Sequence, residues 1–114
     1  MNIQPDHVYQ FSDKFGRRLG SILVSDIANE RYNGILTEGP DFEVVRDLFQ
    51  RQDEAIEGQM LGIWDDVNRE IETLSPSVLL GETDSLRIFD LHVKEGHLVS
   101  FLISPFRPTV RKEK

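Results

Sequence analysis

The residues of this sequence best suited to chemistry are Asp90 and His92, two positions apart, and the nearby His97. Imidazole and carboxylate groups can share a metal ion, but a site needs three or more converging ligands. Asp90 and His92 would lie on one face of a strand, because side chains alternate along it. His97 would join them in only one of two possible hairpin registers, and not in the favoured one. We therefore predict neither a metal site nor a cofactor here.

Other catalytic arrangements have little support in the sequence. The pairs Asp65-Asp66 and Asp53-Glu54 lie on an expected helix, where adjacent side chains diverge, so a solvated acidic face explains them better. No serine stands in a Gly-x-Ser-x-Gly elbow, and no glycines have phosphate-loop spacing. The chain has no cysteine, which excludes disulfides and thiolate chemistry. The sequence predicts no catalytic residue.

The charge is concentrated in one part of the chain. The net charge is −7, and residues 41–74, with ten acids and three bases, account for all of it. Such a balance makes nucleic-acid binding unlikely, because phosphate contacts need a basic surface. Residues 107–114 carry four bases and one acid, typical of a disordered, solvated tail. With no membrane-spanning run and no signal peptide expected, we predict a cytoplasmic protein that does not bind membranes.

The acidic stretch Pro40–Leu74 has the periodicity of a helix. Pro40 and Asp41 are typical of a helix start, and Ser75-Pro76 of a stop. The apolar positions form one stripe at steps that average about 3.6 residues. The stripe comprises Phe42, Val45, Phe49, Ile56, Met60, Ile63, Val67, Ile71 and Leu74.

The opposite face of this helix contains the small residues Ala55, Gly58 and Gly62. One interpretation is a kink or break near Gly58, because an unbroken helix would be about 50 Å long, more than a globule of this size spans. The other is a second contact surface, where small residues let a helix or subunit approach closely. The sequence leaves both open.

Extended segments flank the helix. Before it we expect strands over His7–Phe11, Arg18–Val24 and Arg31–Thr37. Asn33-Gly34 is a strong hairpin signal, but it would leave a poor partner for residues 35–37. We therefore place Gly34 inside the third strand, as a bulge or a point of close backbone approach.

After the helix we expect a short strand over Val78–Leu80 and a hairpin of Leu86–Val93 with His97–Ser104. A three-residue turn at Lys94-Glu95-Gly96, with Gly96 left-handed, separates apolar from mixed positions best. It places Phe89, Leu91, Val93, Val99, Phe101 and Ile103 on the inner face. The mixed outer face holds Ile88, Asp90, His92, Leu98, Ser100 and Leu102, and could bind a ligand or partner.

These expectations give an α+β fold: an antiparallel sheet of five to six strands on one long central helix, kinked or not, in the order β-β-β-α-β-β-β. Residues 1–106 form a single domain, and 107–114 a basic tail. We predict a non-enzymatic interaction or accessory module that forms a homodimer or binds a protein partner. The alternatives are an acidic inhibitor or immunity-type protein whose helix binds a basic partner, and a small enzyme or metabolite-binding protein. The candidate surface residues are Asp90, His92, Leu98, Ser100, Ala55, Gly58 and Gly62.

Overall fold

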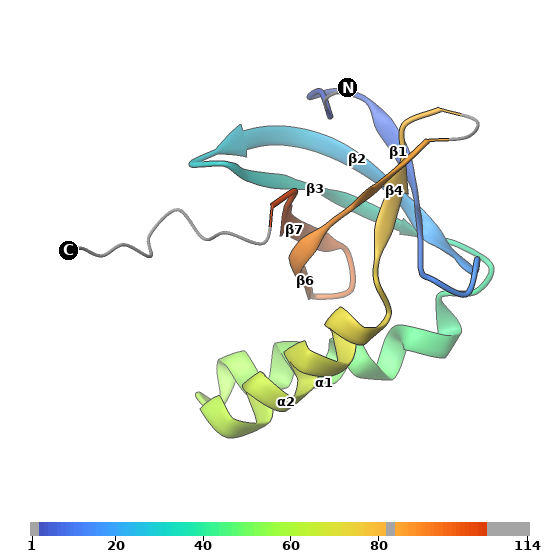
Figure 1. Ribbon diagram of the computed structural model, residues 1–114. Helices are drawn as coiled ribbons and strands as arrows, with labels where there is room; N and C mark the ends of the chain where they lie inside the picture. The colour runs from blue at the N-terminus through green and yellow to red at the C-terminus, as the bar shows by residue number, and fades with distance from the viewer. Residues whose placement is uncertain (1–2, 82–83, 105–114) are drawn as a thin grey trace.

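The computed structural model describes residues 3–81 and 84–104. Within these ranges the chain has an α+β fold, with two helices and one antiparallel sheet of seven strands (Figure 1). The strand order is β5-β4-β1-β2-β3-β7-β6. The elements are β1 (Val8–Ser12), β2 (Arg18–Ala28), β3 (Arg31–Glu38), α1 (Glu43–Glu57), α2 (Leu61–Thr73), β4 (Ser77–Leu79), β5 (Ser85–Arg87), β6 (Phe89–Lys94) and β7 (Leu98–Leu102).

The two edge strands of the sheet are consecutive in the chain. Only Ile88 separates β5 from β6, yet these strands lie at opposite ends of the strand order. The sheet therefore curls around its inner face, and the chain crosses from one end of it to the other (Figure 1). The prediction of one strand over Leu86–Val93 is wrong, because β5 pairs with β4 whereas β6 pairs with β7. This division makes seven strands where five to six were expected.

The prediction of a single central helix is also wrong. Of the two interpretations that the sequence leaves open, the structure has the break near Gly58. Gly58 caps α1 in a right-handed conformation, and Gln59 adopts the left-handed one at φ 55°. The N–H of Met60 donates to the carbonyl of Ala55, and the N–H of Gln59 to that of Ile56. This is the Schellman arrangement that ends many helices, with glutamine at the usual glycine position. The chain then turns back, and α2 packs against α1 (Figure 1).

The break changes which residues of the predicted stripe are buried. Its two ends are in the core, with Phe42, Val45, Phe49, Val67 and Ile71 all buried. Its middle is not, because three residues near the turn keep 41% to 48% of their surface exposed: Ile56, Met60 and Ile63. A continuous helical wheel fails here because the helical phase restarts at α2.

Gly34 lies inside β3, as predicted. The β2–β3 turn is at Asn29 and Glu30, both left-handed with φ 52° and 68°, as a type I′ hairpin turn requires. Gly34 faces Val24 across the pair, and a Cβ built at Gly34 would overlap the carbonyl oxygen of Leu23. The glycine is therefore needed for close approach of the two backbones.

The β6–β7 hairpin keeps the predicted faces close to its turn. The turn lies one residue later than predicted, with Lys94 opposite Leu98, and Gly96 is left-handed as expected. Val93 pairs with Val99 in place of His97, and a change of two residues keeps every side chain on its face. Leu91, Val93, Val99 and Phe101 therefore still point inward and are buried. They share the apolar core with Ile3, Phe11, Leu19, Ile22, Val24, Leu36 and Val78.

At the start of β6 the predicted assignment of residues to the two faces is wrong. The pairing shifts between Phe89 and His92, and Asp90 is left-handed at φ 51°. Alternation is lost at this bulge. As a result Ile88 and Leu102, expected on the outer face, are buried, whereas Phe89, expected inside, is partly exposed.

One apolar core joins the inner face of the sheet to both helices. Its residues come from the strands and the two helices alike, so the described part of the chain is a single domain. No helix among the described residues is long and apolar enough to cross a membrane. The predicted basic tail at 107–114 lies outside the described residues.

Candidate functional site

Four exposed apolar side chains form one row across the outer face of the sheet. Val8 pairs with Leu23, Leu23 with Ile35, and Ile35 with Leu98, so the four side chains lie next to one another on β1, β2, β3 and β7. Their exposed fractions are 61%, 41%, 40% and 39% in that order. Lys94, opposite Leu98, ends the row on β6. We call Val8, Leu23, Ile35 and Leu98 the outer row.

Polar side chains flank the outer row on β1 to β3 and β7, and one of them, Asp26 of β2 opposite Asn33, is charged. On one side Gln10 pairs with Ser21 and Ser21 with Thr37. On the other side Asn33 pairs with Ser100, which is opposite His92. The predicted residues Leu98, Ser100 and His92 are therefore neighbours on one surface. The structure adds Val8, Leu23 and Ile35, which sequence reasoning missed.

The signal for two of the missed residues is a break in alternation. Ile22, Leu23 and Val24 are three consecutive apolar residues in a strand with one buried face. In such a strand the middle residue must face the other side, where polar residues are usual. Ile35-Leu36 is a similar case, because Leu36 is buried and Ile35 is not.

An ion-paired cluster supports the β6 end of this surface. Arg31 donates to the Asp90 carboxylate (Nη1 to Oδ2, 2.9 Å) and to the Asp90 carbonyl (Nη2 to O, 2.7 Å), and its Nε donates to Ser100 Oγ at 3.2 Å. His92 Nε2 lies 3.4 Å from Asp90 Oδ1, within ion-pair range. The pKa of the Asp90 carboxyl is held well below its ordinary value, chiefly by His92 and also by Arg31, against the opposing effect of burial. The cluster fixes Asp90 in its left-handed conformation.

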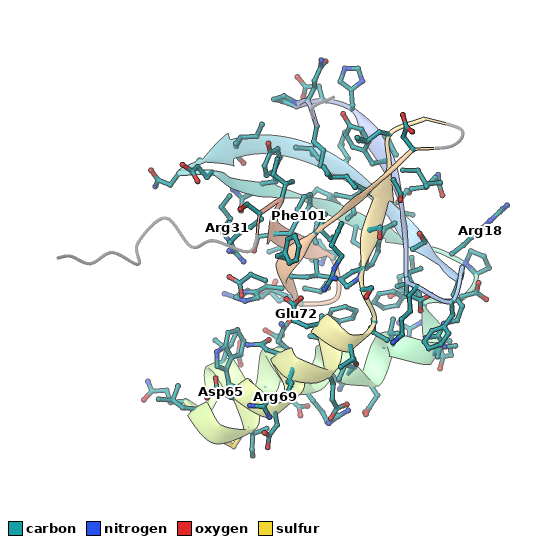
Figure 2. All side chains as sticks on the ribbon, in the orientation of Figure 1. Arg18, Arg31, Asp65, Arg69, Glu72 and Phe101 are labelled. Carbon is teal, nitrogen blue, oxygen red and sulfur yellow. The ribbon has the colours of Figure 1, made fainter. Side chains whose placement is uncertain are left out.

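Helix side chains cover the open edge of β6. Glu72 lies on the side of α2 that faces the sheet (Figure 2), and its Oε2 accepts from the Asp90 N–H at 2.9 Å. The Glu72 Oε1 accepts from Arg87 Nη2 at 2.8 Å. Gln52 bonds the backbone of Leu91 and Val93 on the same edge. This edge is therefore occupied, whereas the outer row on the outer face is exposed.

A second surface lies at the turn between α1 and α2. A hollow of about 330 Å³ opens there. Trp64 and His92 meet in it edge to face, with ring centroids 4.8 Å apart and planes at 77°. Its lining residues are Ala55, Ile56, Gln59, Leu61, Trp64 and His92.

The small residues of the predicted helix surface are separated by the break. Ala55 is buried, with 1% of its surface exposed, and Gly58 caps α1. Gly62 is exposed in the first turn of α2, and a Cβ there would meet no atom within 4 Å. The three residues do not form one face of one helix, because no continuous helix exists. Only Ala55 lines the hollow.

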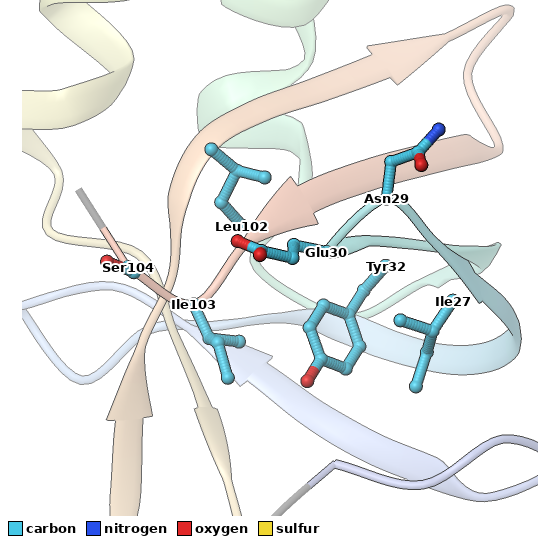
Figure 3. A pocket seen from close by; sticks show the side chains of 7 residues that line it. All are labelled: Ile27, Asn29, Glu30, Tyr32, Leu102, Ile103 and Ser104. Atoms are coloured by element: carbon cyan, nitrogen blue, oxygen red, sulfur yellow. The ribbon is translucent and has the colours of Figure 1, made fainter. Parts of the chain in front are cut away.

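A larger hollow lies elsewhere, at the end of the β2–β3 hairpin (Figure 3). Its volume is about 480 Å³, and Tyr32, stacked on Phe101 at 5.5 Å, forms part of its wall. Among the described residues that line it, Glu30 is the one that carries a charge, so no pair of carboxylates for acid–base chemistry meets there. In residues 3–81 and 84–104, no three His, Asp or Glu side chains converge as metal ligands would.

Comparison with known proteins finds no relative: no family model, no curated protein and no solved structure matches this chain.

Proposed function

We propose that this chain is a protein-interaction module that self-associates through the outer face of its sheet. The observation that carries the proposal is the outer row, four exposed apolar side chains that are contiguous across four strands. Soluble monomers rarely expose a contiguous apolar patch larger than a few hundred Å², and the largest such patch is often functional. A second copy would cover the row by sheet-on-sheet packing.

The distribution of charge supports a second copy as the occupant. The acidic excess of −7 lies in residues 41–74, so two copies would repel each other if they met through their helices. The four residues of the outer row are uncharged, and its charged neighbours are of both signs, Asp26 opposite Asn33 and Lys94 opposite Leu98, so two copies can meet there without that cost. A strongly charged partner would find no complementary group at the centre of this face.

From the size of this surface we expect a weak dimer. A standard stable interface buries about 800 Å² per partner, drawn from 20–30 residues. The outer row with its flanking residues is smaller, so we expect association in the micromolar range.

Sedimentation velocity over a range of protein concentrations tests this proposal. The wild-type chain should shift from monomer to dimer as its concentration rises. The double variant Leu23→Ser with Ile35→Ser should remain monomeric, because it removes the centre of the row. Val44→Ser is the matched control, since Val44 is an exposed apolar residue of α1 (59% exposed) outside the row. A wild-type chain that stays monomeric at every concentration would overturn the proposal.

A further inference from the structure

Four exposed apolar side chains gather where α1 meets α2. Ile56 ends the apolar face of α1, Met60 is in the turn, and Leu61 and Ile63 are in the first turn of α2. Their exposed fractions are 41%, 41%, 71% and 48% in that order. We call Ile56, Met60, Leu61 and Ile63 the helix tip. Leu61, the most exposed of them, also lines the hollow with Trp64.

The hollow can receive one side chain of a partner. Its volume of about 330 Å³ exceeds that of a large apolar side chain, and Ile56 and Leu61 form apolar walls beside the Trp64 ring. Buried aromatic anchors in such pockets supply most of the binding energy in protein interfaces. Inside the hollow, the Trp64 ring is held by its edge-to-face contact with His92. This rigid support reduces the ordering cost of binding.

Acidic side chains surround the helix tip. Glu54 and Glu57 end α1, and Asp65 and Asp66 follow in α2; all four are exposed. Asp66 pairs with Arg69 at 3.1 Å. Within the described ranges the other three form no ion pair, so their charge is available to a partner. The surroundings therefore favour cations and repel anions.

We propose that the helix tip binds a cationic, amphipathic segment of another protein. The segment inserts one bulky apolar side chain beside Trp64 and Leu61, and its lysines or arginines pair with Glu57 and Asp65. A second copy of this chain is a poor occupant, because it would bring the same negative charge to the contact. Anionic membranes and nucleic acids are disfavoured for the same reason. The helix tip adjoins the outer row, because Ile56 lines one groove with Ile35 and Leu98. Its binding centre at Trp64 and Leu61 contains no outer-row residue, so the inference does not depend on the proposed dimer.

Trp64 reports binding directly, because it is the single tryptophan of the chain. The probe is a synthetic amphipathic Lys/Leu peptide, titrated into the full chain while Trp64 emission is followed. A Glu/Leu peptide with the same leucine positions is the control, because it has the same apolar residues and the opposite charge. We expect saturable binding of the first peptide alone, weakened about tenfold or more between about 0.05 M and 0.5 M NaCl.

Two variants test the roles of Leu61 and Asp65 in peptide binding, and a third is the control. Leu61→Ser should weaken binding at least about tenfold, as loss of a central apolar contact does. Asp65→Lys should weaken it and flatten the salt dependence, whereas Asp47→Lys, an equal charge change on exposed α1, should have a small effect. All three positions are exposed, so the fold should tolerate these changes.

Equal binding of both peptides, or binding that Leu61→Ser leaves unchanged, would overturn the inference. The double variant Leu23→Ser with Ile35→Ser should bind the Lys/Leu peptide normally. If this double variant does not bind the peptide, the peptide binds at the outer row, and the proposed site at the helix tip is wrong. A failure of dimerisation alone would leave peptide binding intact, so the two proposals fail in different experiments.

Discussion

The side-chain carbonyl of Gln52 accepts a hydrogen bond from the backbone N–H of Val93 at 3.0 Å. Its Nε2 donates to the carbonyl of Leu91 at 2.9 Å, so one amide side chain forms both bonds that a neighbouring strand would form. Gln52 is 1% exposed. A helix side chain thus closes the edge of β6, which would otherwise invite another chain to pair there.

The first prediction concerns this edge. Gln52→Glu removes the donor to Leu91 and places a buried carboxylate beside a carbonyl oxygen, so we expect a loss of about 3 kcal/mol in the free energy of unfolding at pH 7. Burial should raise the pKa of the introduced carboxyl above its unfolded value, so the loss should shrink as pH falls toward about 4. Urea unfolding at the two pH values measures this. Gln50→Glu, the same change at an exposed position of α1, should cost little at either pH; a similar loss there would reject the edge-closing role.

The second prediction concerns the low pKa of the Asp90 carboxyl. Asn tolerates the left-handed backbone at this position, so Asp90→Asn removes the charge and keeps the conformation. We expect a loss of about 2 kcal/mol at pH 7, because the bonds from Arg31 lose their ionic partner.

The pH dependence of that loss has a defined sign. A carboxyl with a lowered folded pKa stabilises the protein above its unfolded pKa, and this stabilisation is lost as pH falls through the folded value. The difference between wild type and Asp90→Asn should therefore narrow below about pH 4. Asp47→Asn, at a carboxylate that is 83% exposed, should change stability by less than about 0.5 kcal/mol. A wild-type advantage that grows on acidification would contradict this account.

The third prediction concerns the turn between the helices. Gln59 is left-handed where glycine is preferred, so Gln59→Gly should raise the free energy of unfolding by about 0.5–1 kcal/mol. The same substitution inside α1, Gln50→Gly, should lower it by about 1 kcal/mol. Thermal or urea unfolding of the two variants should give opposite signs; two losses would mean that the Schellman turn does not form.

The fourth prediction concerns the close approach of β2 and β3. Gly34→Ala should destabilise the protein by about 3 kcal/mol or more, because the added methyl group meets backbone atoms of Leu23 that cannot move away alone. Gly62→Ala has open space and sits in a helix, so it should be neutral or stabilising by up to about 1 kcal/mol. Urea midpoints of the two variants should separate clearly, and a tolerated Gly34→Ala would place that hairpin in another register.

Much of the fold follows from local signals in the sequence. The α+β class, five of the extended segments (those of β1, β2, β3, β4 and β7), the helix stop at Ser75-Pro76 and the strand position of Gly34 all rest on turn chemistry and alternation. The break near Gly58 was one of two alternatives, because glycine lowers helix stability without fixing where the chain turns. The break is stabilised by tertiary packing of α2 against α1 and of both helices on β6, which the local sequence does not reveal.

The rest depends on long-range pairing. The sequence contains no local signal that residues 85–94 divide between two ends of the sheet, because the bulge at Asp90 is stabilised by Arg31 and Glu72 from distant segments. The candidate surface was found in part, since Leu98, Ser100 and His92 follow from one hairpin register. Val8, Leu23 and Ile35 complete it only once the strand order is known.

The central claim is that the outer row binds a second copy of the chain. Light scattering behind a sizing column, at low and high salt and at high protein concentration, tests it most directly. The account predicts a mass that approaches twice the chain mass of 13.1 kDa at both salt concentrations, because the contact is apolar and uncharged. A mass of one chain under both conditions would contradict it.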